Sequence, residues 1–451
     1  MNKERTVWVW PPGQGAPLEC GHFQWKPGAG RFMYSPAYQG SEDAVALDAV
    51  KLGFNRRVQP HKEDMWNGMF GVFRDASPEG FGLDLLRWKH NRDDLDEIDR
   101  LGLSSGDAVG ALEVCTEAEL ERKLAYEPPQ LQVLCDLMQT DDLEMTSSKL
   151  IQNISKTNDV TSLGGEKPKL TVLVEASDSA PQWWIAKLQE RTGPPLMTER
   201  EYLAMTLAHR CGLDVAAVRF ERVGRHRLLL IQRFDRELVS EVDQSFRATS
   251  RRYAVHRKMF ASAETVLRPR GLDPLGDPER SYVGFAHDMQ RWGGSRTSGF
   301  EQQQQELWRR MSFNALVGNH DDHVRNHGLL YRDGKWTLSP AYDIVAMPSF
   351  SRVLAMAVTP DGSRRVSAEN LVRYAEHFSL TPEHAWETLQ HMARLIVESW
   401  QELLMTECQV KPEDFGLVKP AFNFAQCIVD QSEAPQFDAR KDGNRKKSRM
   451  L

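Results

Sequence analysis

The sequence contains no long apolar run and no paired cysteine motif. Hydrophobic residues nowhere continue for the roughly 20 positions that a membrane-spanning helix requires. The first residues also lack the apolar stretch of a secretory signal. The six cysteines are scattered without a Cys-x-x-Cys pair, which argues against a disulfide framework and against a zinc site. We therefore expect a cytoplasmic protein with reduced thiols and no membrane contact.

Neither sign of charge is in large excess. Lys and Arg number 57 and Asp and Glu 63, which leaves a formal net charge of −6. Bulk charge therefore gives no indication of direct nucleic-acid binding. No internal repeat is visible, and the 41% of hydrophobic and 27% of charged residues are typical of a globular protein. A chain of 451 residues is long enough for two or three domains.

The middle of the chain is predicted to contain a strand-rich unit. Two apolar, β-prone runs are separated by a polar turn and predict a hairpin, and two further strand candidates follow a helix. These four runs are residues 169–175, 183–188, 215–223 and 227–233.

The helix between these strand pairs is expected to run from about Thr198 to Arg210. Thr198 and Glu201 stand at the spacing of a capping box. Lys187 lies in the second apolar strand, where a cation is costly to bury without a partner. Glu201 is the predicted partner, and a lysine that binds phosphates is favoured over one that merely extends into solvent from an edge strand.

Residues 313–343 carry the densest group of polar side chains. An amphipathic helix is predicted to end at Gly318, and a hairpin turned at 332–334 is predicted before Asp343. Between them stand Asn319, His320, Asp321, Asp322, His323, Arg325 and Asn326.

This arrangement indicates phosphoryl transfer. The reaction needs a carboxylate that accepts the proton of the attacking hydroxyl, and an amide and a second carboxylate that hold Mg²⁺ against the phosphates. Asp321 and Asn326 form an Asp-x-x-x-x-Asn pattern, and Asp343 follows the next hairpin, as in protein kinases. The pattern alone is weak, but its combination with the helix, the hairpin and Asp343 favours function over a polar cap on a helix end.

A loop that could cradle phosphates precedes the first strand of the hairpin that carries Lys187. Residues 161–169 include Gly164 and Gly165, which would let backbone N–H groups approach phosphates. The loop is neither a GxGxxG motif nor a Walker motif, and by itself it is equally typical of a plain Gly-Gly turn.

Two other functions remain open at this point. The run His320–His323 could belong to a metal-dependent phosphohydrolase, which would need further histidines on other helices. The chain could also be a nonenzymatic, pseudokinase-like regulator that partners a DNA-binding protein, although all the residues required for the chemistry are present.

Taken in this order, these elements resemble the HipA family, the kinase toxins of bacterial type II toxin–antitoxin modules. The resemblance covers most of the chain. It is carried by residues 71–78, 109–112, 162–169, 185–188, 201–208, 233–236, 319–326 and 338–344.

The resemblance implies a two-lobed, protein-kinase-like α+β fold with a β-rich N-terminal lobe and a mainly helical C-terminal lobe. It implies an ATP- and Mg²⁺-dependent serine/threonine kinase that modifies a protein, such as an aminoacyl-tRNA synthetase, and that pairs with a helix-turn-helix antitoxin. The implied segments are an N-terminal β-rich subdomain (1–115), a helical linker (116–155), an ATP-binding lobe (156–236), a helical catalytic lobe (237–432) and a basic, disordered tail (433–451).

The resemblance also assigns roles to individual residues. It makes Asp321 the catalytic base and Asn326 and Asp343 the Mg²⁺ ligands, with Glu201 supporting Lys187. The implied adenine-binding hinge is the backbone from Gln232 to Phe234, where Gln232 replaces a familiar glutamate. The implied ATP-binding residues are Gly164, Gly165, Glu166, Lys167, Lys169, Lys187, Gln232, Arg233, Phe234, His323 and Tyr342, and the implied autophosphorylation site is Ser162.

Overall fold

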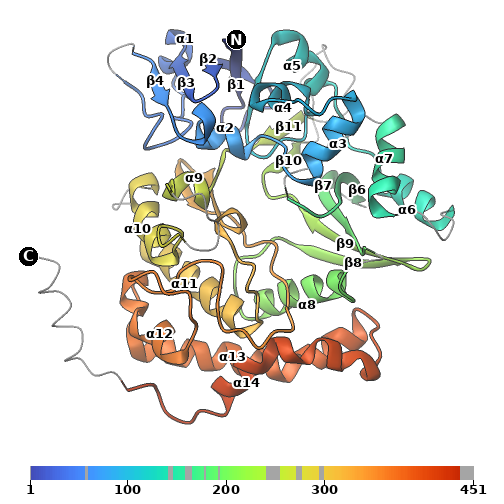
Figure 1. Ribbon diagram of the computed structural model, residues 1–451, viewed down its shortest axis with the longest axis vertical. Helices are drawn as coiled ribbons and strands as arrows, with labels where there is room; N and C mark the ends of the chain where they lie inside the picture. The colour runs from blue at the N-terminus through green and yellow to red at the C-terminus, as the bar shows by residue number, and fades with distance from the viewer. Residues whose placement is uncertain are drawn as a thin grey trace, which may run out of the picture.

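The chain forms a β-rich upper part and a helical lower part, with a four-stranded sheet between them (Figure 1). This agrees with the predicted two-lobed α+β architecture. The computed structural model describes residues 2–55, 59–140, 146–157, 165–176, 179–190, 193–239, 254–270, 277–293 and 299–436.

The N-terminal sheet has five antiparallel strands in the order β4-β3-β2-β1-β5. Its inward side chains alternate along the strands, as a sheet with one buried face requires. Phe23, Phe32, Phe70 and Phe73 pack edge to face beneath it. The strands are β1 (Lys3–Val9), β2 (Leu18–Lys26), β3 (Ala29–Tyr34), β4 (His61–Glu63) and β5 (Leu112–Cys115).

Short helices surround this sheet. The last of them starts at a capping box in which Thr116 and Glu119 each satisfy the other's backbone N–H. The helices are α1 (Pro36–Gln39), η1 (Trp66–Gly68), α2 (Gly71–Asp75), α3 (Phe81–His90), α4 (Glu97–Leu103) and α5 (Glu117–Leu124).

The central sheet consists of the four predicted strands, all antiparallel, in the order β6-β7-β9-β8. They are β6 (Lys169–Ala176), β7 (Ser179–Leu188), β8 (Val218–Val223) and β9 (His226–Gln232). Helices α6 (Leu131–Thr140) and α7 (Ser147–Thr157) share an apolar cluster with this sheet, so the predicted linker forms a packing layer.

Helix α8 (Met197–Arg210) packs against β8 and β9. Its predicted capping box is wrong: Leu196 is the N-cap residue and no side chain of the helix caps it. Instead, Gln189 Oε1 accepts hydrogen bonds from the N–H groups of Met197 and Thr198, at 2.8 and 3.4 Å. The carboxylate of Glu201 is turned into the protein, because Lys187 is a stronger partner than a backbone N–H.

The predicted helical lobe from residue 237 begins with strands, which the sequence analysis did not identify. β10 (Arg236–Val239) pairs with β11 (Ala254–Arg257), and β12 (Phe260–Ser262) joins the predicted hairpin of β13 (Gly328–Arg332) and β14 (Lys335–Leu338). The hairpin turn has Asp333 at φ 52° and Gly334 at φ 77°, the conformation for which Asp-Gly is favoured in a two-residue turn.

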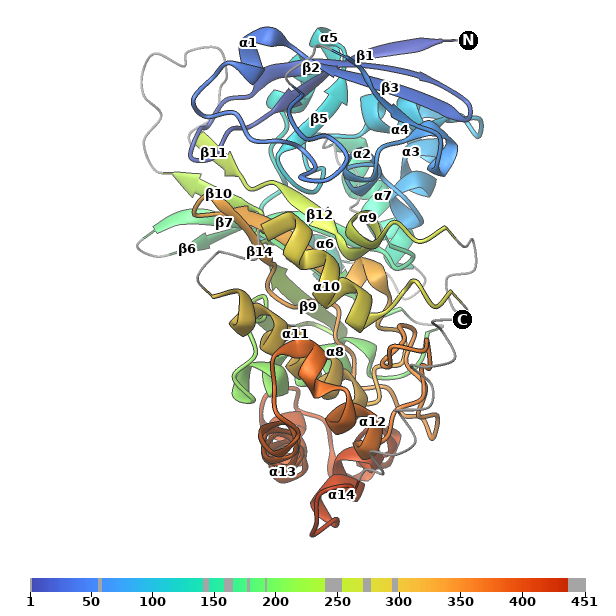
Figure 2. The same ribbon diagram turned by 90° about the vertical axis from the view of Figure 1, so that its left-hand side faces the viewer.

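Helices fill the lower part of the molecule (Figure 2). The long helix α13 buries one face, including Leu389, Met392, Ile396 and Leu403. These helices are α9 (Ala263–Leu267), α10 (Tyr282–Gly293), α11 (Phe300–Leu316), η2 (Val324–Asn326), α12 (Ala368–Arg373), η3 (Ala375–Phe378), α13 (Pro382–Thr406), η4 (Pro412–Leu417), η5 (Lys419–Phe422) and α14 (Asn423–Val429).

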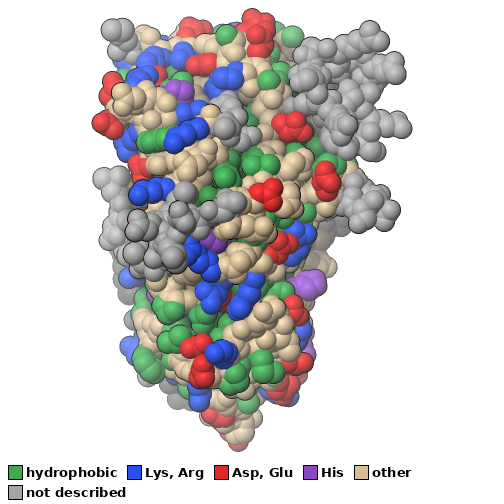
Figure 3. All heavy atoms as spheres, turned by 90° about the vertical axis from the view of Figure 1, so that its right-hand side faces the viewer, with side chains coloured by type: hydrophobic (Ala, Val, Ile, Leu, Met, Phe, Trp, Pro, Cys, Tyr) green, Lys and Arg blue, Asp and Glu red, His purple; other side chains and the backbone are tan. Residues whose placement is uncertain are grey.

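The surface agrees with the balanced composition. On the face shown in Figure 3, the described basic and acidic side chains are interspersed. None of the helices in the described ranges combines the length and the apolar character needed to cross a bilayer.

Candidate active site

Three charged side chains from distant parts of the chain meet between the central sheet and the helical lobe. Lys187 Nζ on β7 lies 2.6 Å from Glu201 Oε1 on α8 and 2.5 Å from Asp343 Oδ1, which follows β14. The predicted Lys187–Glu201 pair is therefore present. The structure adds Asp343 as a second carboxylate on the same ammonium group.

The charges of these residues depend on each other. Burial opposes the charge of Asp343, but the ammonium groups of Lys187 and Lys169 outweigh it and lower the pKa of Asp343 well below its usual value. Burial likewise opposes the charge of Lys187, and Asp343 and Glu201 reverse that effect, so the pKa of Lys187 is raised. Burial, together with the charge of Asp343, raises the pKa of Glu201. We infer that Lys187 and Asp343 form the ionised pair at neutral pH.

A second lysine lies opposite Lys187. Lys169 on β6 and Lys187 on β7 are direct partners in the antiparallel register. Burial and the charge of Lys187 lower the pKa of Lys169 to about 8. Two ammonium groups facing each other are unfavourable without an anion, and Lys167 adds a third positive charge that acts on Asp343. The arrangement therefore suits a polyanion such as a chain of phosphates.

Gly165, in the predicted phosphate loop, lies beside Lys169. Gly165 has φ 108°, and a β-carbon there would lie 2.5 Å from Lys169 Nζ, so only glycine fits without a shift. The Gly165 carbonyl accepts a hydrogen bond from Phe81 N–H at 2.9 Å. Glu166 and Lys167 are exposed. The predicted residues Ser162 and Gly164 lie outside the described residues.

Two neighbouring aspartates of the loop after α11 have different surroundings. Asp322 is 1% exposed. Its Oδ2 accepts hydrogen bonds from Asn314 Nδ2 at 2.7 Å and from the Tyr282 hydroxyl, and it lies 2.8 Å from His327 Nε2. Asp321 is exposed, and its carboxylate makes no hydrogen bond or ion pair with a described residue. Asp322 therefore anchors the loop, and Asp321 is available to a substrate.

Asn326 and Asp343, the predicted Mg²⁺ ligands, are tied together through their neighbours. The Tyr342 hydroxyl donates to the Arg325 carbonyl at 2.8 Å, which links the residue before Asp343 to the residue before Asn326. Asn326 is buried, and its Nδ2 donates to the Asp321 carbonyl at 3.4 Å. Asp343 itself has φ 59°, a strained conformation that is found most often at functional sites.

The donor atoms of this site fit Mg²⁺. A carboxylate and a side-chain amide are hard oxygen ligands, and Mg²⁺ in proteins is commonly held by one or two such groups together with phosphate oxygens and water. Asp343 keeps its negative charge, as a metal ligand must. The lysines beside it supply the positive charge that phosphates would need.

The predicted hinge is partly occupied by the protein itself. The N–H of Gln232 donates to the Ala217 carbonyl at 2.8 Å, and the N–H of Arg233 donates to the Trp183 carbonyl at 2.9 Å. The N–H of Phe234 makes no hydrogen bond within the described residues. Of these three N–H groups, only that of Phe234 is available to an adenine base.

Some side chains near the hinge support the fold, and others are free to contact a ligand. The Arg233 guanidinium is buried against Asp235 at 2.8–2.9 Å, so this side chain has a structural role. The rings of Phe234 and Tyr342 lie 5.5 Å apart. His323 Nδ1 is buried and has no hydrogen-bond partner in the described chain, as a group that contacts a ligand would be.

The four residues from His320 to His323 do not converge on one point. His320 Nδ1 lies 3.0 Å from the Gly318 carbonyl, whereas Asp322 is enclosed by Asn314, Tyr282 and His327. Within the described ranges, no group of three or more His, Cys, Asp or Glu side chains is placed to hold a metal ion.

Several residues that support this site are not apparent from the sequence. Asp322 was recognised only as part of a polar cluster, and nothing local distinguishes it from Asp321. Tyr282 and His327 complete its surroundings, and Tyr282 lies 40 positions away in the sequence. Such contacts leave no periodic pattern that a sequence could reveal.

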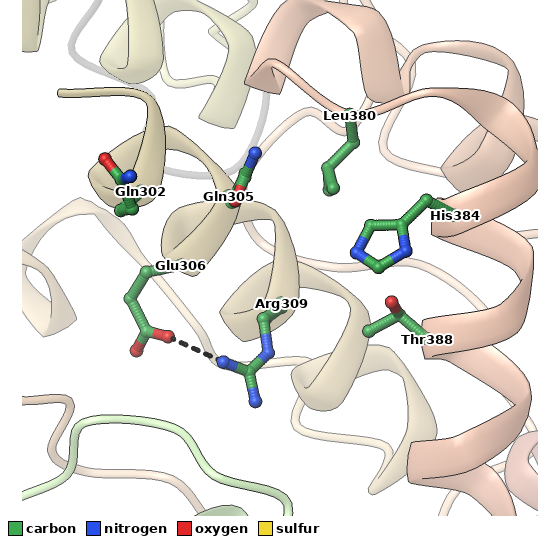
Figure 4. Close-up of a pocket in the computed structure, with 7 residues that line it drawn as sticks. All are labelled: Gln302, Gln305, Glu306, Arg309, Leu380, His384 and Thr388. Carbon is green, nitrogen blue, oxygen red and sulfur yellow. Dashed lines mark ion pairs between the residues drawn. The ribbon is translucent and has the colours of Figure 1, made fainter. Parts of the chain in front are cut away.

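A cavity of about 480 Å³ lies elsewhere, beside helices α11 and α13 (Figure 4). It shares no residue with the site described above. Glu306 and Arg309 form an ion pair of 3.6 Å at its edge. It is lined by Gln302, Gln305, Glu306, Arg309, Leu380, His384 and Thr388.

Comparison with protein families gives two matches that together span most of the chain. The family model described as the HipA-like C-terminal domain matches residues 161–400, and the one described as the HipA N-terminal domain matches residues 16–115. The first contains every predicted catalytic, metal-binding and nucleotide-binding residue. The second contains the segment from α2 to α3, which reaches this site.

Curated relatives are distant. The kinase candidate Y4mE of Sinorhizobium fredii is 26% identical over 369 residues, which cover 75% of this chain and 77% of that protein. A kinase candidate of Haemophilus influenzae is 25% identical over 202 residues, and the match spans only 54% of its length. The serine/threonine-protein kinase toxin HipA of Shewanella oneidensis is 23% identical over 227 residues, or 46% of this chain and 48% of that protein.

A solved structure shares the fold over almost the whole chain. It is a chain of the Shewanella oneidensis complex of HipA, HipB and operator DNA, with a TM-score of 0.63 and 17% sequence identity. The superposition covers 94% of this chain and 96% of the other.

Proposed function

Because this chain belongs to the HipA family, we propose that it is an ATP- and Mg²⁺-dependent serine/threonine protein kinase that acts as a toxin. The observation that carries the proposal is the meeting of Lys187, Glu201 and Asp343. A phosphate-binding lysine, its supporting glutamate and a metal-binding aspartate have this relation in protein kinases.

In the proposed reaction, Asp321 accepts the proton of the attacking serine or threonine hydroxyl. Lys187, Lys169 and Lys167 hold the phosphates of ATP, and the N–H of Phe234 binds the adenine base. Asn326 and Asp343 would hold Mg²⁺, which would neutralise charge that develops on the transferred phosphoryl group. Asp322 keeps the loop in place while Asp321 reacts.

The proposed acceptor is a hydroxyl of a protein, and translation-related proteins such as aminoacyl-tRNA synthetases are the first candidates to test. The proposed partner is a small helix-turn-helix antitoxin. Support for a partner comes from the fold match to a HipA chain that was solved together with HipB and operator DNA. We propose no direct contact of this chain with nucleic acid.

We also propose that the enzyme silences itself by phosphorylating Ser162. This residue precedes Gly164 and Gly165 in the sequence, at the start of the loop in which Gly165 lies beside Lys169. A phosphate adds about −1.5 to −2 charges. Repulsion from the phosphates of ATP would displace the loop.

The proposal is tested with purified protein, Mg²⁺ and labelled ATP. We expect phosphate transfer to protein, and a loss of about 10²- to 10⁴-fold in Asp321→Asn, because an amide cannot accept the proton. Asp333→Asn, the same change in the exposed turn of the neighbouring hairpin, should retain wild-type activity. Mass spectrometry should find phosphate on Ser162 in the wild type and not in Asp321→Asn.

The other outcomes are distinct. A wild-type rate in a folded Asp321→Asn protein would remove Asp321 as the base. Phosphoester hydrolysis without phosphoprotein would favour the phosphohydrolase, and inactivity would favour a nonenzymatic regulator. An unmodified Ser162 in active protein would remove self-silencing and leave the kinase in place.

A further inference from the structure

A short segment of the N-terminal part of the chain touches both halves of the proposed active site. This segment, Glu79-Gly80-Phe81, follows helix α2 and ends at Phe81, the first residue of helix α3. Glu79 contacts the loop that carries Asp321 and Asn326, and Phe81 contacts the loop that carries Gly165.

The first contact joins Glu79 to Arg325. Arg325 Nη2 donates to Glu79 Oε1 at 3.2 Å, and Nη1 of the same guanidinium pairs with Glu79 Oε2. On its other side, Arg325 Nε donates to Glu264 Oε2 of α9 at 2.7 Å. The guanidinium therefore lies between two carboxylates, which restricts its orientation.

Arg325 is well placed to transmit this restriction. It immediately precedes Asn326, and its own carbonyl accepts the hydrogen bond from the Tyr342 hydroxyl next to Asp343. Fixing Arg325 therefore fixes the backbone from which both proposed metal ligands extend.

The second contact joins the segment to the phosphate loop. Phe81 N–H donates to the Gly165 carbonyl at 2.9 Å. Gly80 has φ 53° and ψ −127°, and a β-carbon on it would lie 2.5 Å from that same carbonyl oxygen. The close approach of the two loops therefore requires a glycine at position 80.

Helix α2, which precedes the segment, is hydrogen-bonded to the start of α9 through Asp75. Asp75 accepts hydrogen bonds from Ser262 N–H at 2.8 Å, from Ser262 Oγ at 2.6 Å and from Thr265 Oγ1 at 2.8 Å. Ser262 is also the N-cap of α9, the helix that carries Glu264. Both partners of Arg325 are thus held relative to each other.

We propose that Glu79 and Arg325 are positioning residues, through which the N-terminal subdomain sets the catalytic loop against the phosphate loop. The inference rests on the proposed kinase function and goes beyond it, because it gives a role in the reaction to the N-terminal subdomain, which contains none of the predicted catalytic or nucleotide-binding residues. Neither residue touches the reacting atoms in this account.

The partial exposure of the pair makes the test practicable. The side chains of Arg325 and Glu79 are 40% and 28% exposed, so their interaction contributes little to the stability of the fold. Small displacements of reacting groups, in contrast, cost up to about 100-fold in rate. Removing the pair should therefore reduce catalysis far more than stability.

The experiment measures kcat, the KM for ATP and the melting temperature of the full chain. Glu79→Gln and Arg325→Gln should each lower kcat about 10- to 100-fold, with little change in KM for ATP or in melting temperature. The double variant should lose little more than the worse single variant, because the Glu79–Arg325 pair is the contact that both changes break. Asp84→Asn, which breaks the exposed Arg87–Asp84 pair of 3.3 Å on α3, should leave all three values unchanged.

A kcat of Glu79→Gln close to that of the wild type, or losses that multiply in the double variant, would overturn the inference. If Glu79→Gln fails to fold, the same measurements on Arg325→Gln test the pair. If the wild type transfers no phosphate, the proposed function fails, and hydrogen exchange still tests the contact. Amides of residues 321–327 and 165–169 must then exchange faster in Glu79→Gln than in Asp84→Asn, and equal exchange would overturn it.

Discussion

Asp343 combines a strained backbone with a buried negative charge. Its φ of 59° is unfavourable for a residue with a β-carbon, by an amount on the order of 1 kcal/mol. Its contact with Lys187 and its proposed metal ligation both need a carboxylate at this position, and Asp tolerates this conformation better than most residues.

We predict that Asp343→Asn and Asn326→Ala both weaken binding of Mg²⁺-ATP, by at least about tenfold. Each change removes an oxygen that would ligate the metal, and Asp343→Asn also removes one partner of Lys187. Calorimetric titration with ATP and Mg²⁺ measures the effect, and titration in EDTA is the control. Unchanged affinity in both variants at saturating Mg²⁺ would remove these residues as metal ligands.

Lys169 should make nucleotide binding sensitive to pH. Its pKa in the free protein is about 8, below the ordinary 10.5, because of burial and the nearby Lys187. Bound phosphates favour the protonated form and raise this pKa. The contribution of Lys169 to affinity is therefore fully present below about pH 8 and is lost as the pH rises above it.

The corresponding measurement is proton uptake on binding. At pH 8.5, we expect about 0.5 to 0.8 protons to be taken up per ATP bound. Calorimetry in two buffers with different ionisation enthalpies gives this number. Lys169→Met should abolish the uptake, and binding by the wild type without proton exchange would contradict the assignment.

At the scale of elements, the β13–β14 hairpin matters because it connects Asn326 to Asp343. Its turn needs a positive φ at Gly334. Gly334→Ala should lower the free energy of unfolding by about 1–2 kcal/mol. A β-carbon there meets no other atom within 4 Å, so the loss would come from backbone strain alone.

Gly416→Ala is the matched control for this turn. A β-carbon at Gly416 also meets nothing within 4 Å, and its φ is not positive. Urea unfolding should find this variant within about 0.5 kcal/mol of the wild type. Equal stabilities of the two variants would show that the turn carries no strain.

At the scale of the whole molecule, a buried cluster of charged side chains at residues 233–236 holds the backbone that precedes β5. Asp235 pairs with Arg233 at 2.8 Å and with Arg236 at 2.9 Å, and it accepts from Gly110 N–H at 2.9 Å. Burial opposes the charge of Asp235, but the two arginines outweigh it and lower its pKa well below the usual value. Both arginines also donate to backbone carbonyls of Asp107, Ala108 or Gly110.

We predict that Asp235→Asn lowers the free energy of unfolding by about 3–5 kcal/mol, because two buried guanidinium groups lose their counter-charge. Urea unfolding measures this, and Glu237→Gln is the control. The Lys258–Glu237 pair is 3.6 Å long and largely exposed, so its loss should cost less than about 1 kcal/mol.

The pH dependence gives an independent check of Asp235. A carboxylate with a lowered pKa contributes stability that is fully present above its unfolded value of about 3.9, and this contribution is lost as the pH falls through the folded value. The difference between wild type and Asp235→Asn should therefore shrink below about pH 4. A difference that stays constant with pH would show that charge is not its cause.

Local sequence patterns were sufficient to predict many of the elements of this protein. Apolar, β-prone runs indicated the four strands of the central sheet, and Asp-Gly indicated the β13–β14 turn. The spacing of Asp321 and Asn326 indicated the loop that is proposed to be catalytic. These features depend on neighbours in the chain, which a sequence displays directly. The family resemblance, confirmed by both domain matches, supplied the order of the elements and the two-lobed fold.

Other properties were decided only by tertiary packing. Asp322 anchors its loop because the fold encloses it with Tyr282 and His327, whereas Asp321 stays exposed. The lowered pKa of Lys169 depends on its burial and on the strand partner beside it. Glu79 and Arg325 are separated by 246 positions, so no local pattern relates them. Burial and long-range contact are properties of the packed chain, and they determine which of the predicted polar residues can react.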